Sequence, residues 1–312
     1  MPDANSGLRA AGPGAGRRLD RRPTQGWAFF TDTSVCIGCK ACEVACKEWE
    51  RRARLRVGPA RHVLRTTPGA LTANSWRHVA FVEQPRPAAD AAGSAAPAAG
   101  PGPQFLGMPG AQPPGRGTGA AGRSDFRWLM MSDVCKHCTH AACLDVCPTG
   151  SLFRTEFGTV VVQEDICNGC GYCIPACPYG VIDQRRGDGR AWKCTLCYDR
   201  LGAGLTPACA QACPTGSIQY GPLDELRERA AERVATLHER GVPEARLYGH
   251  DPTDGVGGDG AFFLLLDAPE VYGLPPDPVV TTRDLPRMWR RAGLAALAMA
   301  AAAVAAFVGG SS

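Results

Sequence analysis

The chain has 312 residues, a formal net charge of +4 and 16 cysteines. A chain of this length can form one large domain or two to three small ones with a sizeable core, so it does not need its cysteines as the disulfide framework of a small secreted scaffold. The nearly balanced charge differs from the strongly basic composition of nucleic-acid-binding proteins, and we expect no nucleic-acid partner.

The N-terminal residues 1–25 are rich in Gly, Ala and Arg and are predicted to form a disordered tail. No apolar run follows the N-terminus, so we expect no signal peptide. The arginine pairs at 17–18 and 21–22 lead into Pro23 and Gln25 rather than into a hydrophobic segment. This favours a solvated tail over an export signal.

The cysteines fall into four groups of four, with none left over, and three of the groups end in Cys-Pro. The groups lie in the stretches CIGCKACEVACKEW, CKHCTHAACLDVCP, CNGCGYCIPACPYG and CTLCYDRLGAGLTPACAQACP. Repeated C-x2-C pairs are typical of metal sites that hold zinc or iron–sulfur clusters. Zinc sites pair two C-x2-C units across a longer gap and do not call for the additional cysteines. The pattern therefore favours iron–sulfur clusters over zinc and over disulfides.

A [4Fe–4S] cubane requires four thiolates around one compact inorganic core. In bacterial ferredoxins three of them come from a tight loop, and the fourth, three residues further on, binds the other cluster of a pair. We expect this fourth cysteine to open a helix, because the proline after it suits the first turn of a helix.

The crossed rule also predicts which cysteines share a cluster. A short interval between the second and third groups contains SLFRTEFGTVVVQED, predicted to be a β-hairpin with its turn near Phe157–Gly158, so these groups form an inner pair. The first and fourth groups form an outer pair. The predicted ligand sets are Cys36, Cys39, Cys42 and Cys213; Cys194, Cys197, Cys209 and Cys46; Cys135, Cys138, Cys143 and Cys177; and Cys167, Cys170, Cys173 and Cys147.

The segments outside the clusters have simpler interpretations. The basic run at 51–65 is interpreted as a solvated face, with docking to a partner or to acidic lipid as the alternative. Residues 75–83 and 261–267 are predicted strands, the second one buried and too short to cross a membrane. Residues 223–241 are predicted to form an amphipathic helix that ends at Gly241.

The C-terminal residues 287–309 are predicted to form a transmembrane anchor helix. Their apolar run from Ala292 to Val308 spans roughly 25 Å as a helix, against a hydrocarbon core of about 30 Å. Trp289, Arg290 and Arg291 precede the run as interfacial anchors would. Most of the run is alanine, and a buried or surface helix is the alternative.

These elements predict an α+β fold of two nested bacterial-type 2[4Fe–4S] ferredoxin units, with a C-terminal extension and a single C-terminal transmembrane helix. The expected parts are the tail at 1–25, an outer ferredoxin unit at 26–83 and 192–222, a low-complexity insertion at 84–124, an inner ferredoxin unit at 125–191, the extension at 223–286 and the anchor at 287–309.

No catalytic constellation is evident in this chain. His137 and His140 lie between cysteines of the second group, and Lys40, Lys136 and Lys193 lie beside other cysteines. Hydrogen bonds from such residues to a cluster sulfur would shift its reduction potential, so His137, His140 and Lys193 are candidate tuning residues. Solvated loop side chains are the alternative.

The chain resembles the iron–sulfur (β) subunits of membrane-bound respiratory formate dehydrogenases, within the wider group of molybdopterin-oxidoreductase electron-transfer subunits. The resemblance is carried by CIGCKACEVACKEW, CNGCGYCIPACPYG, WKCTLCYDRL with PACAQACPTGSI, and, beyond the clusters, LYGHDPTDGVGG and DAPEVYGLPPDP. It covers roughly residues 27–308 apart from the 84–124 insertion. In related nitrate reductase subunits one ligand position is not cysteine, whereas all are cysteine here, so four [4Fe–4S] clusters are expected.

The resemblance implies a non-catalytic relay. A separate catalytic subunit with a molybdenum or tungsten bis-pterin cofactor would oxidise formate, and this chain would carry the electrons to a membrane subunit that holds haem b or a quinone site. The outer cluster pair would face the catalytic subunit and the inner pair the membrane. The equivalent relay of a sulfoxide or polysulfide reductase, and a zinc-stabilised interaction module, are the alternative functions.

The resemblance also bears on localisation, which we expect to be the cell membrane. Exported family members hold the globular part outside the cytoplasm. The arginines at 283, 287, 290 and 291 precede the predicted anchor, and by the positive-inside rule they would place the globular part in the cytoplasm instead. A folded, cofactor-loaded complex need not follow a rule about short loops, so we favour the family arrangement.

Overall fold

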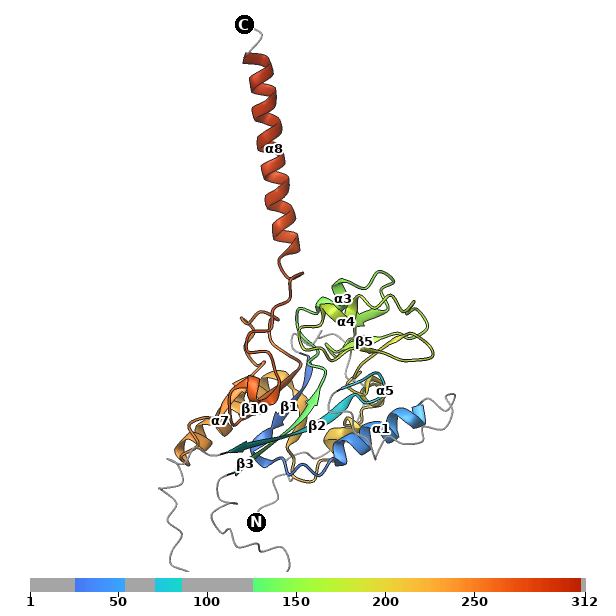
Figure 1. Ribbon diagram of the computed structural model, residues 1–312, viewed down its shortest axis with the longest axis vertical. Helices are drawn as coiled ribbons and strands as arrows, with labels where there is room; N and C mark the ends of the chain where they lie inside the picture. The colour runs from blue at the N-terminus through green and yellow to red at the C-terminus, as the bar shows by residue number, and fades with distance from the viewer. Residues whose placement is uncertain (1–25, 54–70, 86–125, 310–312) are drawn as a thin grey trace, which may run out of the picture. The chain divides into compact units, whose positions relative to one another are not determined.

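The computed structural model describes residues 26–53, 71–85 and 126–309 (Figure 1). The predicted N-terminal tail, the basic run from residue 54 onwards and nearly all of the predicted insertion at 84–124 lie outside these residues. The chain divides into two units, residues 1–80 with 131–312, and residues 81–130. In the smaller unit, Arg127 donates a hydrogen bond to Gln84 at 2.9 Å.

A four-stranded sheet organises the larger unit. Its strand order is β8 (Ile218–Pro222), β1 (Trp27–Asp32), β10 (Ala261–Leu265) and β9 (Arg246–Tyr248). Strand β1 pairs in parallel with β10 and antiparallel with β8, while β9 pairs antiparallel with β10. The N-terminal strand is therefore held on both sides by strands from the C-terminal third of the chain.

The sheet packs against helix α7 (Leu223–Glu239) because alternate residues of its strands point to the same face. Ala28 and Phe30 of β1 lie in one core cluster with Leu226 of α7 and Phe262 of β10. The rings of Phe30 and Phe262 stack with centroids 5.3 Å apart. Burial of each phenylalanine or leucine side chain in this cluster stabilises the fold by about 1.5–3 kcal/mol.

A second set of contacts fixes the end of β1, directly before the first cysteine group. Asp32 is buried, and its carboxylate accepts hydrogen bonds from the Ser34 amide at 2.9 Å and from Arg233 of α7 at 2.9 Å. Thr33 donates to the carbonyl of Leu264 in β10 at 2.7 Å. The cluster loop that follows thus starts from a rigid position.

Most of the remaining elements are short and lie near the cysteines, whereas the terminal helix α8 (Leu285–Gly309) is long and carries none. The strand pairs are β2 (Arg77–Pro85) with β3 (Phe126–Val134), β4 (Leu152–Arg154) with β5 (Val160–Val162), and β6 (Asp183–Gln184) with β7 (Ala191–Trp192). The helices are η1 (Thr33–Val35), α1 (Ala41–Ala53), α3 (Ala142–Asp145), α4 (Cys173–Ala176), α5 (Tyr198–Gly202), α6 (Ala208–Gln211), η2 (Pro269–Tyr272) and α8 (Leu285–Gly309).

Several predicted elements are confirmed. The hairpin forms as antiparallel β4 and β5, with Gly158 at a φ of 80° in its turn. The predicted strands appear as β2 and β10, and every residue of β10 is buried. The amphipathic helix appears as α7 and is followed by Gly241 at a φ of 80°. The α+β class is therefore confirmed.

The predicted anchor is confirmed only as a helix, α8. Its larger apolar side chains are exposed, including Trp289, Leu294 and Leu297. Among the helices of the described residues, none combines the length and the apolar character that crossing a membrane requires. Arginines occupy the first turns of α8, and most of its apolar run is weakly hydrophobic alanine. The transmembrane part of the prediction is not confirmed.

Candidate metal centres

Each C-x2-C pair closes a loop with the same unusual backbone conformation. The residue directly before the second cysteine is left-handed in all four loops, with φ values of 64° at Gly38, 50° at His137, 75° at Gly169 and 58° at Leu196. Left-handed residues let successive amide N–H groups point into one concavity, which suits an anionic group. For His137 and Leu196 this conformation costs about 1–3 kcal/mol, so the surrounding structure must hold it in place.

The third cysteine of three groups lies in a one-turn helix. Cys143 lies in α3, Cys173 begins α4 and Cys209 lies in α6. In the first group α1 continues through both Cys42 and Cys46, because no proline interrupts it.

The fourth cysteine does not open a helix, so this prediction was wrong. Each Cys-Pro begins a tight turn that ends at a left-handed glycine, Gly150, Gly180 or Gly216. The amides of these glycines donate to the carbonyls of Cys147, Cys177 and Cys213 at 3.2–3.3 Å. Proline fits the second position of a β-turn as well as the first turn of a helix, and here the turn is formed.

These turns also direct amide groups at the sulfur. Burial raises the pKa of Cys147, but N–H groups of Leu152, Thr149 and Ser151 hydrogen-bond its sulfur and bring that pKa below its ordinary value. The amides of Val181, Tyr179 and Gly180 act in the same way on Cys177, although burial dominates there and raises its pKa. Amide donors favour the thiolate, which is the form that binds iron.

The thiol neighbours of four cysteines, Cys36, Cys46, Cys138 and Cys173, follow the crossed assignment. We name the predicted ligand sets I (Cys36, Cys39, Cys42, Cys213), II (Cys194, Cys197, Cys209, Cys46), III (Cys135, Cys138, Cys143, Cys177) and IV (Cys167, Cys170, Cys173, Cys147). Helix α1 packs against α6, and α3 against α4, which brings together thiols from distant parts of the sequence.

The pKa shifts identify these neighbours. Burial raises the pKa of Cys36, and the nearby thiols of Cys213 and Cys39 raise it further. Burial also raises the pKa of Cys173 to about 11, with Cys167, Cys147 and Cys170 adding to it. Burial likewise raises the pKa of Cys46, and the nearby thiols of Cys194, Cys209 and Cys197 add to the shift. Burial also raises the pKa of Cys138, where the thiols of Cys135, Cys177 and Cys143 contribute. The assignment of each set to one cluster remains a prediction that this geometry supports.

Contacts between sets give their order. Cys42 of set I lies close enough to Cys209 of set II for the two thiols to interact electrostatically. Cys194 of set II interacts with Cys135 of set III, and Cys143 of set III with Cys173 of set IV. The four sets thus follow one another in the order I, II, III, IV.

The two ends of this series are exposed and its middle is not. All four thiols of set II are buried. Set I exposes Cys39, with Ile37 beside it 59% exposed, and set IV exposes Cys170, with Tyr172 beside it 62% exposed. Electrons can therefore enter and leave at sets I and IV without crossing the core.

Comparisons with known proteins place iron–sulfur domains over the cysteine groups. Two family models, each described as a 4Fe–4S dicluster domain, match residues 35–151 and 126–223. The nitrate-inducible formate dehydrogenase iron–sulfur subunit of Escherichia coli is 36% identical over 259 residues, covering 82% of this chain and 74% of the relative. The formate dehydrogenase iron–sulfur subunit of Haemophilus influenzae is 36% identical over 257 residues, covering 81% and 70%.

The chain belongs to the family of formate dehydrogenase iron–sulfur subunits. It is an electron-transfer subunit that carries [4Fe–4S] clusters and not a catalytic one. A related protein, the B subunit of the anaerobic dimethyl sulfoxide reductase of E. coli, is 32% identical over 212 residues, covering 68% of this chain and 81% of the relative. The matched models describe iron–sulfur domains, so we set the zinc alternative aside.

The residues of this iron–sulfur subunit fit its cofactor. All sixteen cysteines are free thiols, as cluster ligation requires. In the described part of the chain, no three His, Cys, Asp or Glu side chains converge on a position for a single metal ion. A cubane does not require such convergence, since its four thiolates bind four different iron atoms.

Buried donors without protein partners also suit an inorganic core. His137 accepts a hydrogen bond from the Val160 amide at Nδ1, 3.1 Å away, and its buried Nε2 has no partner. Burial, followed by the positive charges of Lys193, Arg154 and Arg77, holds the pKa of His137 well below its ordinary value. The neutral ring therefore carries its proton on Nε2 and can donate it to a sulfur.

The other candidate tuning residues differ in their surroundings. His137 and Lys193 are buried, so the solvated-loop alternative is wrong for both, whereas His140 is half-buried beside Gly257. Lys136 is buried but contacts Asp133 and the carbonyl of Val134, and its ammonium lies over the ring of Phe263. Lys40 lies 3.7 Å from Glu43. Tuning by His137, His140 and Lys193 remains a prediction.

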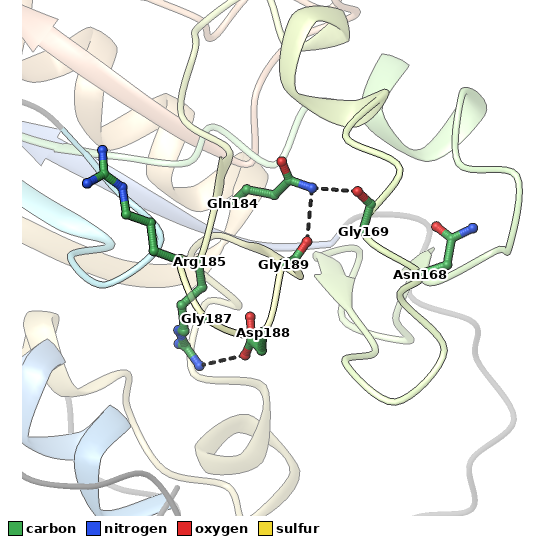
Figure 2. Close-up of a pocket in the computed structure, with 8 residues that line it drawn as sticks. Asn168, Gly169, Gln184, Arg185, Gly187, Asp188 and Gly189 are labelled. Carbon is green, nitrogen blue, oxygen red and sulfur yellow. Dashed lines mark hydrogen bonds and ion pairs between the residues drawn. The ribbon is translucent and has the colours of Figure 1, made fainter.

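A pocket of about 340 Å³ lies beside the loop of set IV (Figure 2). Gln184 points between two backbone segments and donates to the carbonyls of Gly169, at 2.5 Å, and Gly189, at 2.9 Å. Arg185 and Asp188, which also line this pocket, form an ion pair at 3.6 Å. The hairpin of β6 and β7 thus holds the Cys167–Cys170 loop in place.

Sequence reasoning missed Arg77. This residue is fully buried, donates to the carbonyl and hydroxyl of Ser132 at 3.2 and 3.0 Å, and lies over the ring of Phe29. The Ser132 hydroxyl is in turn 3.2 Å from the sulfur of Cys42. The sequence shows only an arginine at the start of a strand-like run, RHVAFVE, and its burial follows from the structure.

Proposed function

We propose that this chain relays electrons from a catalytic subunit that oxidises formate at a molybdenum or tungsten bis-pterin centre to a membrane subunit with haem b or a quinone site. The observation that carries the proposal is the linear order of the four ligand sets with exposed thiols at both ends. Bound [4Fe–4S] clusters supply one-electron transfer, and this chain supplies their spacing, burial and hydrogen bonds.

The direction of the relay rests on the family resemblance, which puts the outer cluster pair at the catalytic subunit and the inner pair at the membrane. Set I, with Cys39 and Ile37 exposed, would meet the catalytic subunit, and set IV, with Cys170 and Tyr172 exposed, would meet the membrane subunit. Sets II and III lie between them and need no surface of their own. This arrangement places the outer predicted pair nearer the electron donor and the inner pair nearer the acceptor.

Formate as the electron source is favoured over a sulfoxide-reductase role by the extent of similarity. The formate dehydrogenase relatives match 81–84% of this chain, and the B subunit of the dimethyl sulfoxide reductase matches 68%. The second role remains the alternative function, because the relay itself would serve either complex and the substrate binds to a different subunit.

The test is anaerobic EPR on the detergent-extracted native complex, with formate and dithionite compared as reductants. We expect formate to reduce the clusters to the level that dithionite reaches, with a spin count that accounts for four cubanes. Reduction by dithionite alone would keep the relay and overturn formate as its source. Absence of any cluster signal would overturn the iron–sulfur assignment itself.

We also propose that α8 holds the chain at the cell membrane, with the cluster-bearing part on the extracytoplasmic side. Its exposed Leu294, Leu297 and Met299 and its many alanines suit close packing against helices of the membrane subunit. Replacement of Leu297 with Asp should release the chain from washed membranes, whereas Arg283→Gln, before the helix, should not. Protease digestion of intact spheroplasts tests the side: protection of the cluster-bearing part would overturn this placement.

A further inference from the structure

Two buried cations lie where successive ligand sets meet. Arg77 and Lys193 both rank among the largest side chains that are completely buried. A charged group this deep is costly unless opposite charge or hydrogen bonds compensate for it. The question is which groups compensate these two.

Arg77 lies between sets I and II. Its electrostatic neighbours are the thiols of Cys42 in set I and of Cys209, Cys194 and Cys46 in set II. Its Nη1 donates to Ser132, but Nη2 is buried without a protein partner. The guanidinium is always charged and carries five N–H donors, so at least one of them remains available to a ligand sulfur.

Lys193 lies between sets II and III. Its ammonium donates to the carbonyls of Val160 and Cys194 and hydrogen-bonds the thiol of Cys135 in set III. The thiols of Cys143 in set III and Cys194 in set II are its other charged neighbours. Two neutral carbonyls do not balance a buried ammonium, whereas thiolates on both sides do.

We propose that Arg77 and Lys193 are fixed positive charges at two successive junctions of the relay, each raising the reduction potentials of both clusters that it separates. Set II borders both cations, so the reduction potential of its cluster should be raised the most. This inference rests on the proposed function, because it concerns the same four clusters, and it goes further by assigning residues that set their potentials.

Negative charge near the same thiols supplies an internal control. Glu50 of α1 is half-buried and interacts unfavourably with Cys46 and Cys197, both of set II. Asp259 does so with Cys138 of set III. If fixed charge determines the potentials, removal of Glu50 should act on the cluster of set II alone and in the direction opposite to removal of a cation.

The experiment is a mediated redox titration of the holo-complex followed by EPR, comparing wild type with Arg77→Gln, Lys193→Met and Glu50→Gln. Each cation variant should shift two of the four midpoint potentials downward, with one component common to both variants. A tenfold change in the reduction equilibrium, about 59 mV for one electron, is expected for the common component in each case. Glu50→Gln should shift that same component upward and no other.

Matched variants separate charge from packing. Arg77→Lys keeps the charge and should leave all four potentials within about threefold in the reduction equilibrium. Lys136→Met removes an equally buried lysine whose ammonium faces Asp133, and it should leave the common component unchanged. If Arg77→Gln or Lys193→Met fails to assemble four clusters, Arg77→Lys and Glu50→Gln still decide the question.

Three results of this titration would contradict the inference. If the two cation variants share no component, if all four potentials move together, or if Glu50→Gln lowers a potential, the inference is overturned. In this titration dithionite and mediators control the potential of the solution, so the measured midpoint potentials do not depend on electron transfer from formate. Failure of formate to reduce the clusters would overturn the proposed function and leave this result standing.

Discussion

The ends and the middle of the relay are built differently. In sets I and IV a ligand is exposed, apolar side chains beside it face solvent, and the sulfur of Cys213 or Cys147 lies within 3.6–3.8 Å of a threonine hydroxyl. Set II is wholly buried and borders two buried cations. Exposed ligands are therefore confined to the ends of the relay, while set II in the middle is buried and bordered by fixed positive charge.

The largest effect should come from removing a middle ligand. Cys209→Ser in set II should lose its cluster and abolish transfer from formate to the acceptor, because no water reaches this buried site to replace the thiolate. Cys170→Ser at the exposed end should keep a cluster with altered potential. Iron content and EPR of both variants provide the measurement. Equal loss in the two variants would remove the distinction between ends and middle.

A backbone change at the end set should have the next largest effect. A Cβ at Gly169 would lie 2.6 Å from the carbonyl oxygen of Gly189, and the φ of 75° is strained for any side chain. Gly169→Ala should therefore cost about 1–3 kcal/mol from the backbone strain alone, with the clash in addition. The readout is the thermal loss of cluster absorbance.

Gly150→Ala is the control for that change. Its φ is +67°, but nothing lies within 4 Å of the added Cβ, so only the same backbone strain of about 1–3 kcal/mol applies. If both alanine variants lose cluster absorbance at the same temperature, the hairpin of β6 and β7 does not hold the set IV loop.

Surface changes at the two ends should slow electron transfer about tenfold without altering any potential, since aromatic and apolar anchors at the centre of an interface contribute more than 1 kcal/mol. The neutral substitution Ile37→Asn should slow the reduction of the clusters by formate, and Tyr172→Ser should slow their reoxidation by the acceptor. Stopped-flow absorbance separates the two phases. The opposite pairing of variant and phase would reverse the proposed direction of the relay.

The smallest effects should follow Thr149→Val and Thr215→Val. Each removes a hydroxyl near the sulfur of Cys147 or Cys213 and keeps the side-chain volume. Loss of a donor lowers the potential of one end cluster, by less than about 59 mV for so weak a contact. The set III turn has Tyr179 at the same position, so it provides a natural comparison. A shift in a middle cluster would contradict the assignment of these ligands to the end sets.

Local patterns in the sequence predicted local structure well. Helix α7, the β4–β5 hairpin and buried β10 each follow from a periodicity or a turn signal within a single segment. The spacing of the cysteines also led to the four ligand sets, which remain a prediction. The helix, the hairpin and the buried strand need no knowledge of distant residues.

Other features depended on tertiary packing and were missed. The left-handed conformation of His137 and Leu196 contradicts their intrinsic preferences and is imposed by the loop around the sulfur. Arg77 alternates along β2 like any strand residue, and its burial beside Cys42 arises only from non-local contacts. The Cys-Pro turns were mistaken for helix starts because proline satisfies both.

The position of β1 has a consequence for how the protein matures during synthesis. The ligands of the predicted inner sets III and IV all lie between residues 135 and 177, whereas set I needs Cys36 together with Cys213. Strand β1, which precedes Cys36, pairs with β8 and β10 in the sheet, so its pairing awaits residues 218–222 and 261–265. A growing polypeptide can therefore complete the acceptor half before the donor half. Because such long-range pairing is slow, Cys36, Cys39 and Cys42 remain the longest without their partner.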